Sequence, residues 1–254
     1  NNTIDFGEVC ADSWSPETNL VGGASFSNTQ SIETDGVDDH VSVPVPYTTI
    51  DARDTFSISC WLKMPSGGGG GVIGKNRTDS YNAKRFTFVV NETTIEINTN
   101  SLAFRNTSLS LGNNWINVIV SVDRSRSTQS DRCRVYVNNV QQTNQGSTNF
   151  TQIVADTSPL TIGTLTRGTT SPIILTPFQG KIDEVAIWQT ALSATDVSNI
   201  YNGGSPNDVS GLGITGLINW WRFEGTGTTA TDSGTGANDG TLTNGATRST
   251  DVPT

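Results

Sequence analysis

Charged residues are scarce in this chain of 254 residues: they make up 15% of it, against about 25% in an average soluble protein. Histidine is almost absent, since His40 is the single one, and the 15 basic residues are outnumbered by 24 acidic ones. A net charge of −9 repels a phosphate backbone, so we expect no nucleic-acid binding. A lone histidine removes most His-based catalysis and His-rich zinc sites, and we expect no enzymatic activity.

Long apolar runs are also missing. No run of about 18 apolar residues is present, so we expect no segment that spans a membrane. The three cysteines, at positions 10, 60 and 133, are far apart and fit no metal-binding or redox spacing. What the chain has instead is 26 glycines among many Ser, Thr and Asn residues. Such a composition favours short strands joined by turns over long helices.

The clearest periodic signal has a period of two residues. In Phe56–Lys63 the side chains alternate between an apolar face and a more polar face, and Trp61 is on the polar one. Ser193–Gly204 is the one segment with a helical pattern, with a Ser at the N-cap position and glycine at the end. Further strands are expected at 85–90, 94–97, 115–122, 134–137, 160–163, 180–188 and 217–224. We therefore predict an all-β, two-sheet antiparallel jelly-roll sandwich with one short helix near residues 193–202.

Two domain-level segments are expected. Residues 1–208 form the jelly roll, and residues 209–254 form a Gly/Thr-rich C-terminal segment that has too few apolar residues for a core of its own. This segment should complete the same sandwich or clasp a neighbouring chain. The Gly67–Gly71 run is expected to be a flexible loop tip.

Three segments together resemble a known module. Ser31–Val41, Phe56–Lys63 and Phe178–Trp188, in this order, are similar to a laminin-G-like module of the concanavalin A-like lectin/glucanase group. The resemblance extends over about residues 31 to 204. It implies a jelly roll of two curved antiparallel sheets, and binding of glycans or proteins, in some members with calcium.

The C-terminal segment departs from that pattern. Trp220–Gly225 and Asn238–Leu242 resemble the first strand and loop of such a module, but they stand at the end of this chain. This C-terminal tail is similar to the tails of laminin-G-like modules in virion proteins of marine bacteriophages. This second resemblance implies a place on the surface of a virion, among other virion subunits.

Closely spaced carboxylates are candidates for a cation site. Asp35, Asp38 and Asp39 surround a glycine turn, and hard cations prefer several oxygen ligands in a flexible loop. In the family, Asp183 and Glu184 are expected beside this turn, and together the five residues are a candidate site for a structural calcium ion. The alternative is that Asp38 and Asp39 only accept hydrogen bonds from backbone N–H groups of the turn.

Flat aromatic rings are candidates for sugar contacts, because sugar rings stack on them. Trp61 and Tyr136 alternate with apolar residues on their strands and are expected to be exposed, and Tyr81 and Trp14 are further candidates. The alternative is that tryptophan in a two-layer sandwich belongs to the core. Trp115, Trp188 and at least one of Trp220 and Trp221 are expected to be buried.

The expected function is that of a non-enzymatic, extracellular or virion-surface module, such as a capsid decoration, fibre or tail-associated protein, with glycans as ligands. Two alternatives remain open. One is a purely structural brace of a virion, and the other is a carbohydrate-binding module of a secreted bacterial protein. We expect no membrane partner. We expect the protein to be oligomeric within an assembly.

Overall fold

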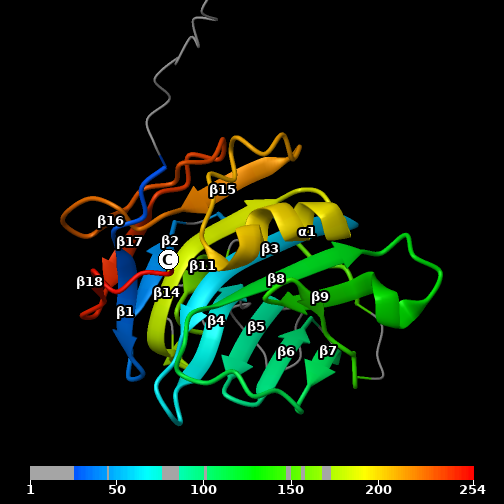
Figure 1. Ribbon diagram of the computed structural model, residues 1–254, viewed down its shortest axis with the longest axis horizontal. Helices are drawn as coiled ribbons and strands as arrows, with labels where there is room; N and C mark the ends of the chain where they lie inside the picture. The colour runs from blue at the N-terminus through cyan, green and yellow to red at the C-terminus, as the bar shows by residue number, and fades with distance from the viewer. Residues whose placement is uncertain are drawn as a thin grey trace, which may run out of the picture.

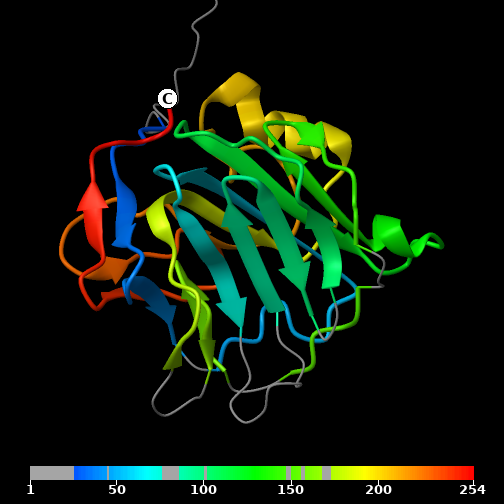
Figure 2. The same ribbon diagram turned by 90° about the horizontal axis from the view of Figure 1, so that it is seen from below.

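The computed structural model describes residues 26–44, 46–75, 86–99, 102–146, 150–155, 158–167 and 173–254. Two antiparallel layers face each other and curve around a common core (Figures 1 and 2). The prediction of a β-sandwich with one short helix is confirmed. Within the described ranges, no helix is long and apolar enough to cross a membrane.

The first layer is centred on the longest strand, β14 (Gln179–Trp188). On one side of it, in spatial order, lie β3 (Thr55–Lys63), β8 (Ile116–Asp123), β9 (Cys133–Val137) and β10 (Val140–Gln141). On its other side two strands share its length. β1 (Ser31–Asp35) pairs with the first half of β14 and continues to β18 (Thr247–Ser249), and β15 (Leu217–Trp221) pairs with the second half.

The second layer contains eight strands. In spatial order these are β7 (Leu102–Asn106), β6 (Thr94–Asn98), β5 (Phe86–Asn91), β4 (Gly69–Lys75), β11 (Leu160–Ile162), β2 (His40–Val43), β17 (Gly240–Thr243) and β16 (Thr229–Ala230). A single residue pair, Gln179 with Gly69, connects this layer to β14. A separate hairpin is formed by β12 (Thr166–Arg167) and β13 (Ile173–Ile174).

The main core lies between the two layers. The apolar face predicted for Phe56–Lys63 points into it, with Phe56, Ile58, Cys60 and Leu62 completely buried. Burial of each such side chain contributes roughly 1.5–3 kcal/mol. The period of two in the sequence therefore identified the inner face of β3 correctly.

The glycine run is a turn only in its first part: Gly67 and Gly68 lie between β3 and β4, whereas the prediction of a loop tip is wrong for Gly69–Gly71. Gly69 opens β4, and Gly70 and Gly71 continue it. A Cβ atom at Gly70 would lie 2.2 Å from the carbonyl oxygen of Pro177, and one at Gly71 would lie 2.6 Å from Leu165. The glycines are thus needed because another backbone segment passes directly over this strand.

A second, smaller core covers the outer face of the first layer. The helix α1 (Ala194–Tyr201) lies across this face, and Figure 1 shows it above β3 and β8. Its capping box, in which Ser193 and Asp196 exchange hydrogen bonds, fixes its start as expected from the sequence. Two short 3₁₀ turns, η1 (Gln129–Arg132) and η2 (Asn202–Gly204), complete the elements. The buried residues of this second core are Ile119, Tyr136, Ala186, Trp188, Leu192, Val197, Ile200, Val209 and Trp220.

The strands of the C-terminal segment pair with strands of the same sandwich. β15 pairs with β14, β17 with β2, and β18 with β1. Leu242 of β17 is 7% exposed and belongs to the main core. Trp188, Trp220 and Trp221 are buried as predicted. Trp115 is only half-buried, and its ring nitrogen donates a hydrogen bond to Asp251 of the C-terminal segment at 3.0 Å.

Candidate functional site: a polar groove and a closed carboxylate cluster

The acidic turn connects β1 to β2 and carries Asp35, Asp38 and Asp39. Gly36 has φ +83°, which lets the chain reverse directly after Asp35. Asp35 accepts a hydrogen bond from the backbone N–H of Val37 at 2.8 Å, and Asp39 accepts one from the backbone N–H of Asp35 at 3.2 Å. Asp39 therefore accepts a backbone hydrogen bond within the turn, as one of the two interpretations of the sequence proposed. No side-chain hydrogen bond is recorded for Asp38 within the described residues.

The three carboxylates of this turn lie close together. One oxygen of each is within 4.8 Å of the others. The pKa of Asp39 is raised, first because its carboxyl is removed from water and then because the charges of Asp35 and Asp38 repel its own. Three carboxylate oxygens at this spacing are a donor set that suits a hard divalent cation such as calcium.

A groove of about 600 Å³ opens beside the acidic turn. The groove is lined by Asp35 and Asp39, by the start of β14, and by Asn244 and Gly245 of the turn between β17 and β18. This turn lies against the acidic turn, because Asn244 donates its amide to the backbone carbonyl of Asp38 at 3.2 Å. The lining residues are Glu33, Thr34, Asp35, Asp39, Lys63, Pro65, Asn113, Gln179, Gly180, Lys181, Asn244, Gly245 and Thr247. In the part of the chain that the structure describes, the lining holds carboxylates, ammonium groups, amides and hydroxyls, and no aromatic ring.

Two lysines at the groove are held by one carboxylate. Lys63 donates to both side-chain oxygens of Asp251, at 3.0 and 2.8 Å, and Lys181 donates to one of them at 2.9 Å. Burial raises the pKa of Asp251, but hydrogen bonds from Lys63, Lys181 and Trp115 outweigh this and leave the pKa well below its usual value. Both ammonium groups are thus fixed, and Asp251 stays ionised.

Asp183 and Glu184 are not beside the acidic turn, so this part of the predicted site is wrong. Antiparallel pairing of β1 with β14 places Asp35 opposite Gln179, four residues before Asp183. Four residues of strand span about 13 Å. Among the described residues, the carboxylates close enough to share one ion are those of Asp35, Asp38 and Asp39.

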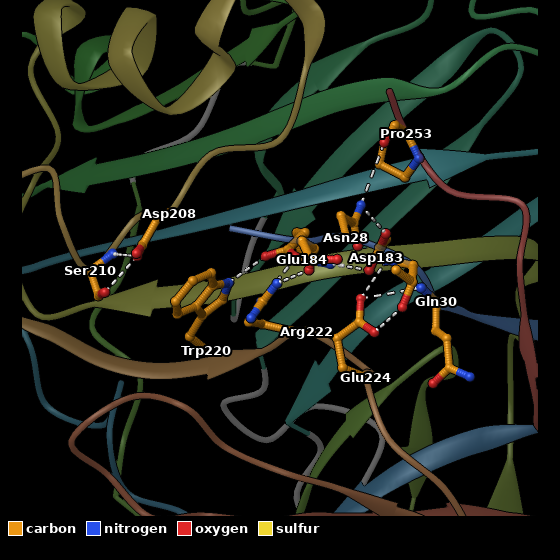
Figure 3. Close-up of polar contacts among 12 residues, drawn as sticks. Asn28, Gln30, Asp183, Glu184, Asp208, Ser210, Trp220, Arg222, Glu224 and Pro253 are labelled. Atoms are coloured by element: carbon orange, nitrogen blue, oxygen red, sulfur yellow. Dashed lines mark hydrogen bonds and ion pairs between the residues drawn. The ribbon is translucent and has the colours of Figure 1, made fainter. Parts of the chain in front are cut away.

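Because of a β-bulge, the side chains of Asp183 and Glu184 point to the same side of β14. The pairing with β3 shifts between Asp183 and Ala186, and Glu184 has φ +47°, a conformation uncommon outside glycine. Neighbouring residues of a regular strand point to opposite faces, whereas here both carboxylates lie on the outer face, among the polar side chains of Figure 3.

Glu184 is enclosed by two residues of the adjoining strand and its end. Trp220 donates its ring N–H to Glu184 at 2.5 Å, and Arg222 lies 3.4 Å from the other carboxylate oxygen. The guanidinium carbon of Arg222 lies 4.7 Å from the ring centre of Phe26 and 5.0 Å from that of Trp220, so Arg222 stacks against both rings. Loss of water around Glu184 outweighs these favourable contacts and raises its pKa to about 7.

Residues 26–30 close this cluster from outside, and we call them the strap. Arg222 donates to the backbone carbonyl of Ser27, and Asn28 donates its amide to Asp183 at 2.9 Å. Glu224 accepts from the backbone N–H groups of Thr29 and Gln30, at 2.6 and 3.2 Å. Figure 3 shows Asn28 next to Asp183 and Gln30 next to Glu224.

Asp183 is completely buried beneath the strap, and its pKa is raised well above the usual value. The main cause is the loss of water, and the second is repulsion by Glu184. The carboxylates of this cluster thus find hydrogen-bond partners within the chain. We refer to Asp183, Glu184 and Glu224 as the closed cluster.

The predicted aromatic platform is not exposed. Trp61 is 3% exposed and stacks on Tyr201 of α1, with ring centres 6.1 Å apart. Tyr136 is 4% exposed and lies in the second core. Their predicted exposure is wrong because the helix covers the strand face that the sequence pattern marks as polar. Tyr81 and Trp14 lie outside the described residues.

The sequence reasoning missed most of the groove. Gln179, Lys63 and Lys181 stand in segments that were read only as strands, and Asn244 and Thr247 stand in the Gly/Thr-rich tail. Glu224 and the strap were missed as well. A faint signal existed for the tail, because its resemblance to the first strand of a module implied pairing within the sandwich.

Comparisons with known proteins agree with this architecture. The family model of the concanavalin A-like lectin/glucanases superfamily matches residues 35–198. A proposed carbohydrate-binding protein from Bacteroides ovatus is similar in structure, with a TM-score of 0.60 and 18% identity over 90% of this chain and 62% of that one. The CBM40 domain of the IT-sialidase from Ruminococcus gnavus has a TM-score of 0.50 and 14% identity over 68% of this chain and 98% of that one. No curated protein matches the chain.

Proposed function

Since this chain belongs to the concanavalin A-like lectin/glucanases superfamily, we propose that it is a non-enzymatic carbohydrate-binding module. Its binding surface is the groove beside the acidic turn, lined by residues of that turn, of the start of β14 and of the β17–β18 turn. The observation that supports this is the lining itself: a hollow of about 600 Å³ that offers side-chain acceptors and donors from both layers. That volume suits a small number of sugar rings.

The groove is built to hold hydroxyl groups. Carboxylates such as Asp35 accept hydrogen bonds from sugar hydroxyls, and amides such as Gln179 and Asn244 both donate and accept. Because no ring among the described lining residues stacks on a sugar, these polar contacts carry the binding. Recognition of this kind distinguishes sugars by the position of their hydroxyls, since an unpaired buried polar group is costly.

Calcium at the acidic turn is part of this proposal. Asp35, Asp38 and Asp39 would hold the ion, and the ion would supply a positive centre that offsets their repulsion and binds sugar oxygens. The raised pKa of Asp39 is consistent with this, because loss of water and repulsion by Asp35 and Asp38 disfavour its charge, and a bound cation would favour it.

A glycan array tests the function. The purified protein is applied with about 1 mM calcium and again with a chelator. The comparison variants are the triple change Asp35→Asn, Asp38→Asn and Asp39→Asn, and Asp54→Asn. Asp54 pairs with Arg124 at the opposite end of β3 from Lys63 and serves as the control.

We expect binding that the triple change abolishes and the control change preserves. Loss of binding on chelation supports the calcium site, and binding in both conditions leaves the groove as a calcium-independent sugar site. If no glycan binds, the module is a structural brace and the proposal is wrong. If the triple variant binds as well as the wild type, the acidic turn does not contribute to the sugar site and the assignment of the groove is wrong.

The place of the module in the cell or virus is a separate proposal. We propose that it is displayed outside the cell, on the surface of a phage particle and next to other virion subunits, on the strength of the sequence resemblance of its tail. Immunogold labelling of purified particles tests this. Label on intact particles is expected, and label confined to the bacterial culture fluid would favour a module of a secreted bacterial protein.

A further inference from the structure

The charges that reach the groove are dominated by acidic groups, although two lysines line it. Glu33, Asp35 and Asp39 line the groove together with Lys63 and Lys181. The ammonium group of Lys63 donates to both oxygens of Asp251, and that of Lys181 shares one of these oxygens and lies 3.9 Å from Glu33. The positive charge of the two lysines is therefore already paired within the chain.

We propose that Asp251 sets the charge specificity of the groove. By holding both lysines it leaves the wall carboxylates dominant, so that the groove binds neutral and amine-bearing glycans and rejects glycans that carry carboxylate or sulfate groups. This inference depends on the proposed glycan-binding function. It extends that function by naming the class of sugar that fits.

The hydrogen bonds of Asp251 hold the two lysine ammonium groups in place. Its two oxygens receive three lysine contacts of 2.8 to 3.0 Å and a fourth hydrogen bond from the ring nitrogen of Trp115. The side chains of Lys63, Lys181 and Asp251 are 27%, 20% and 34% exposed, so the contacts are partly shielded from water. Charge-assisted hydrogen bonds of this length are stronger than neutral ones and hold the ammonium groups in place.

The same conclusion holds with or without a cation at the acidic turn. A divalent ion would offset two of the three negative charges of Asp35, Asp38 and Asp39. Glu33 and Asp251 would still balance the two lysines, so the groove would not become positive. The overall net charge of −9 acts in the same direction on an approaching polyanion.

Asp251 stands outside the part of the chain that matches the family model, which covers residues 35–198. The lysines it holds are inside that part, on β3 and β14. The charge of the groove is thus decided by a residue that the C-terminal segment adds.

The test compares wild type, Asp251→Asn and the control Asp54→Asn, which makes the same change in net charge far from the groove. The probes are a neutral and amine-bearing glycan array, oligogalacturonate, and the methyl ester of oligogalacturonate, which has the same sugars without the charge. Binding is measured at low and high salt, because screening weakens charge effects.

We expect the wild type to prefer the methyl ester to the acid, and Asp251→Asn to raise the ratio of acid to ester binding about tenfold at low salt. Asp54→Asn should leave the ratio unchanged. The proposal is overturned if the wild type prefers the acid, or if Asp251→Asn leaves the ratio at the wild-type value. If no variant binds any glycan, the proposed function itself has failed.

A second variant keeps the test decisive should Asp251→Asn fold poorly. In the double change Lys63→Gln and Lys181→Gln, the wild-type preference for uncharged glycans should persist, because the removed charges were paired with Asp251. A wild type that binds the acid more tightly than the ester, with this preference lost in the double variant, would show that the lysines recognise anions, which contradicts the proposal.

Discussion

Two clusters of three carboxylates lie on this molecule, and they differ in what surrounds them. Asp35, Asp38 and Asp39 are on a turn at the edge of a groove, with one oxygen of each within 4.8 Å of the others. Asp183, Glu184 and Glu224 are covered by the strap, Trp220 and Arg222. The same chemical groups thus border a groove in one place and are enclosed by the chain's own side chains in the other.

The difference shows how to tell a candidate site from a structural cluster. Strongly raised pKa values alone would have selected Asp183 and Glu184, because burial shifts them most. Their oxygens, however, already receive hydrogen bonds from Asn28, Trp220 and Arg222. The groove beside the carboxylates, together with the absence of an ion pair to Asp35, Asp38 or Asp39 among the described residues, points to the acidic turn instead.

The largest effect on stability is expected from removing the Trp220 side chain, which covers Glu184 of the closed cluster. Trp220→Ala deletes a ring that is 4% exposed, donates to Glu184 and stacks on Arg222. We predict a loss of about 3–5 kcal/mol in the free energy of unfolding, measured by urea denaturation. Phe26→Ala, on the half-buried strap, should cost clearly less. Equal losses for the two variants would mean that the strap and the second core are a single unit.

The pH dependence of stability should come from the closed cluster. The pKa of Glu184 is raised from 4.5 to about 7 in the folded protein, so its protonated form is favoured by folding. The contribution to stability is complete below pH 4.5 and is lost as the pH rises to about 7; the rise in pKa corresponds to about 3 kcal/mol. Glu184→Gln should remove most of this slope in unfolding experiments across the range.

A contrary result is easy to recognise. If wild type and Glu184→Gln show the same change in unfolding free energy between pH 4.5 and 7, Glu184 does not titrate there, and its ion pair with Arg222 is stronger than the 3.4 Å separation indicates. Asp183 has a raised pKa as well and should add to the slope in the same direction.

The smallest effect on stability is expected at the acidic turn. Asp38→Asn removes one of three mutually repelling carboxylates that receives no recorded side-chain hydrogen bond in the described part of the chain. The free energy of unfolding should stay within about 0.5 kcal/mol of the wild type. In contrast, any rise in melting temperature on adding calcium should shrink. A large loss of stability without calcium would show that Asp38 has a structural role.

The sequence was informative wherever the signal was local. The alternation in Phe56–Lys63 identified the inner face of β3, and Ser193 with the acid three residues later located α1. The order of three strand motifs indicated the family, which the match to residues 35–198 confirms. The first two patterns, and each single motif of the third, depend on neighbours within about ten residues.

The errors arose from contacts between distant segments. Trp61 was expected to be exposed because nothing near it in the sequence shows that Tyr201 stacks on it. The positive φ of Glu184 turned a regular strand into a bulge and brought two carboxylates to one face. The groove could not be predicted because its walls come from residues as far apart as Glu33 and Thr247.

The most direct test of the two-cluster comparison is a calorimetric titration of one glycan, the strongest binder on the array, into three proteins. These are the wild type, Gln179→Ala in the groove and Glu184→Gln in the closed cluster. We predict that Gln179→Ala weakens binding about tenfold, since it removes a polar side chain from the groove floor, and that Glu184→Gln leaves the affinity unchanged. Weaker binding by Glu184→Gln with full affinity in Gln179→Ala would place the sugar at the closed cluster and contradict the assignment of the groove.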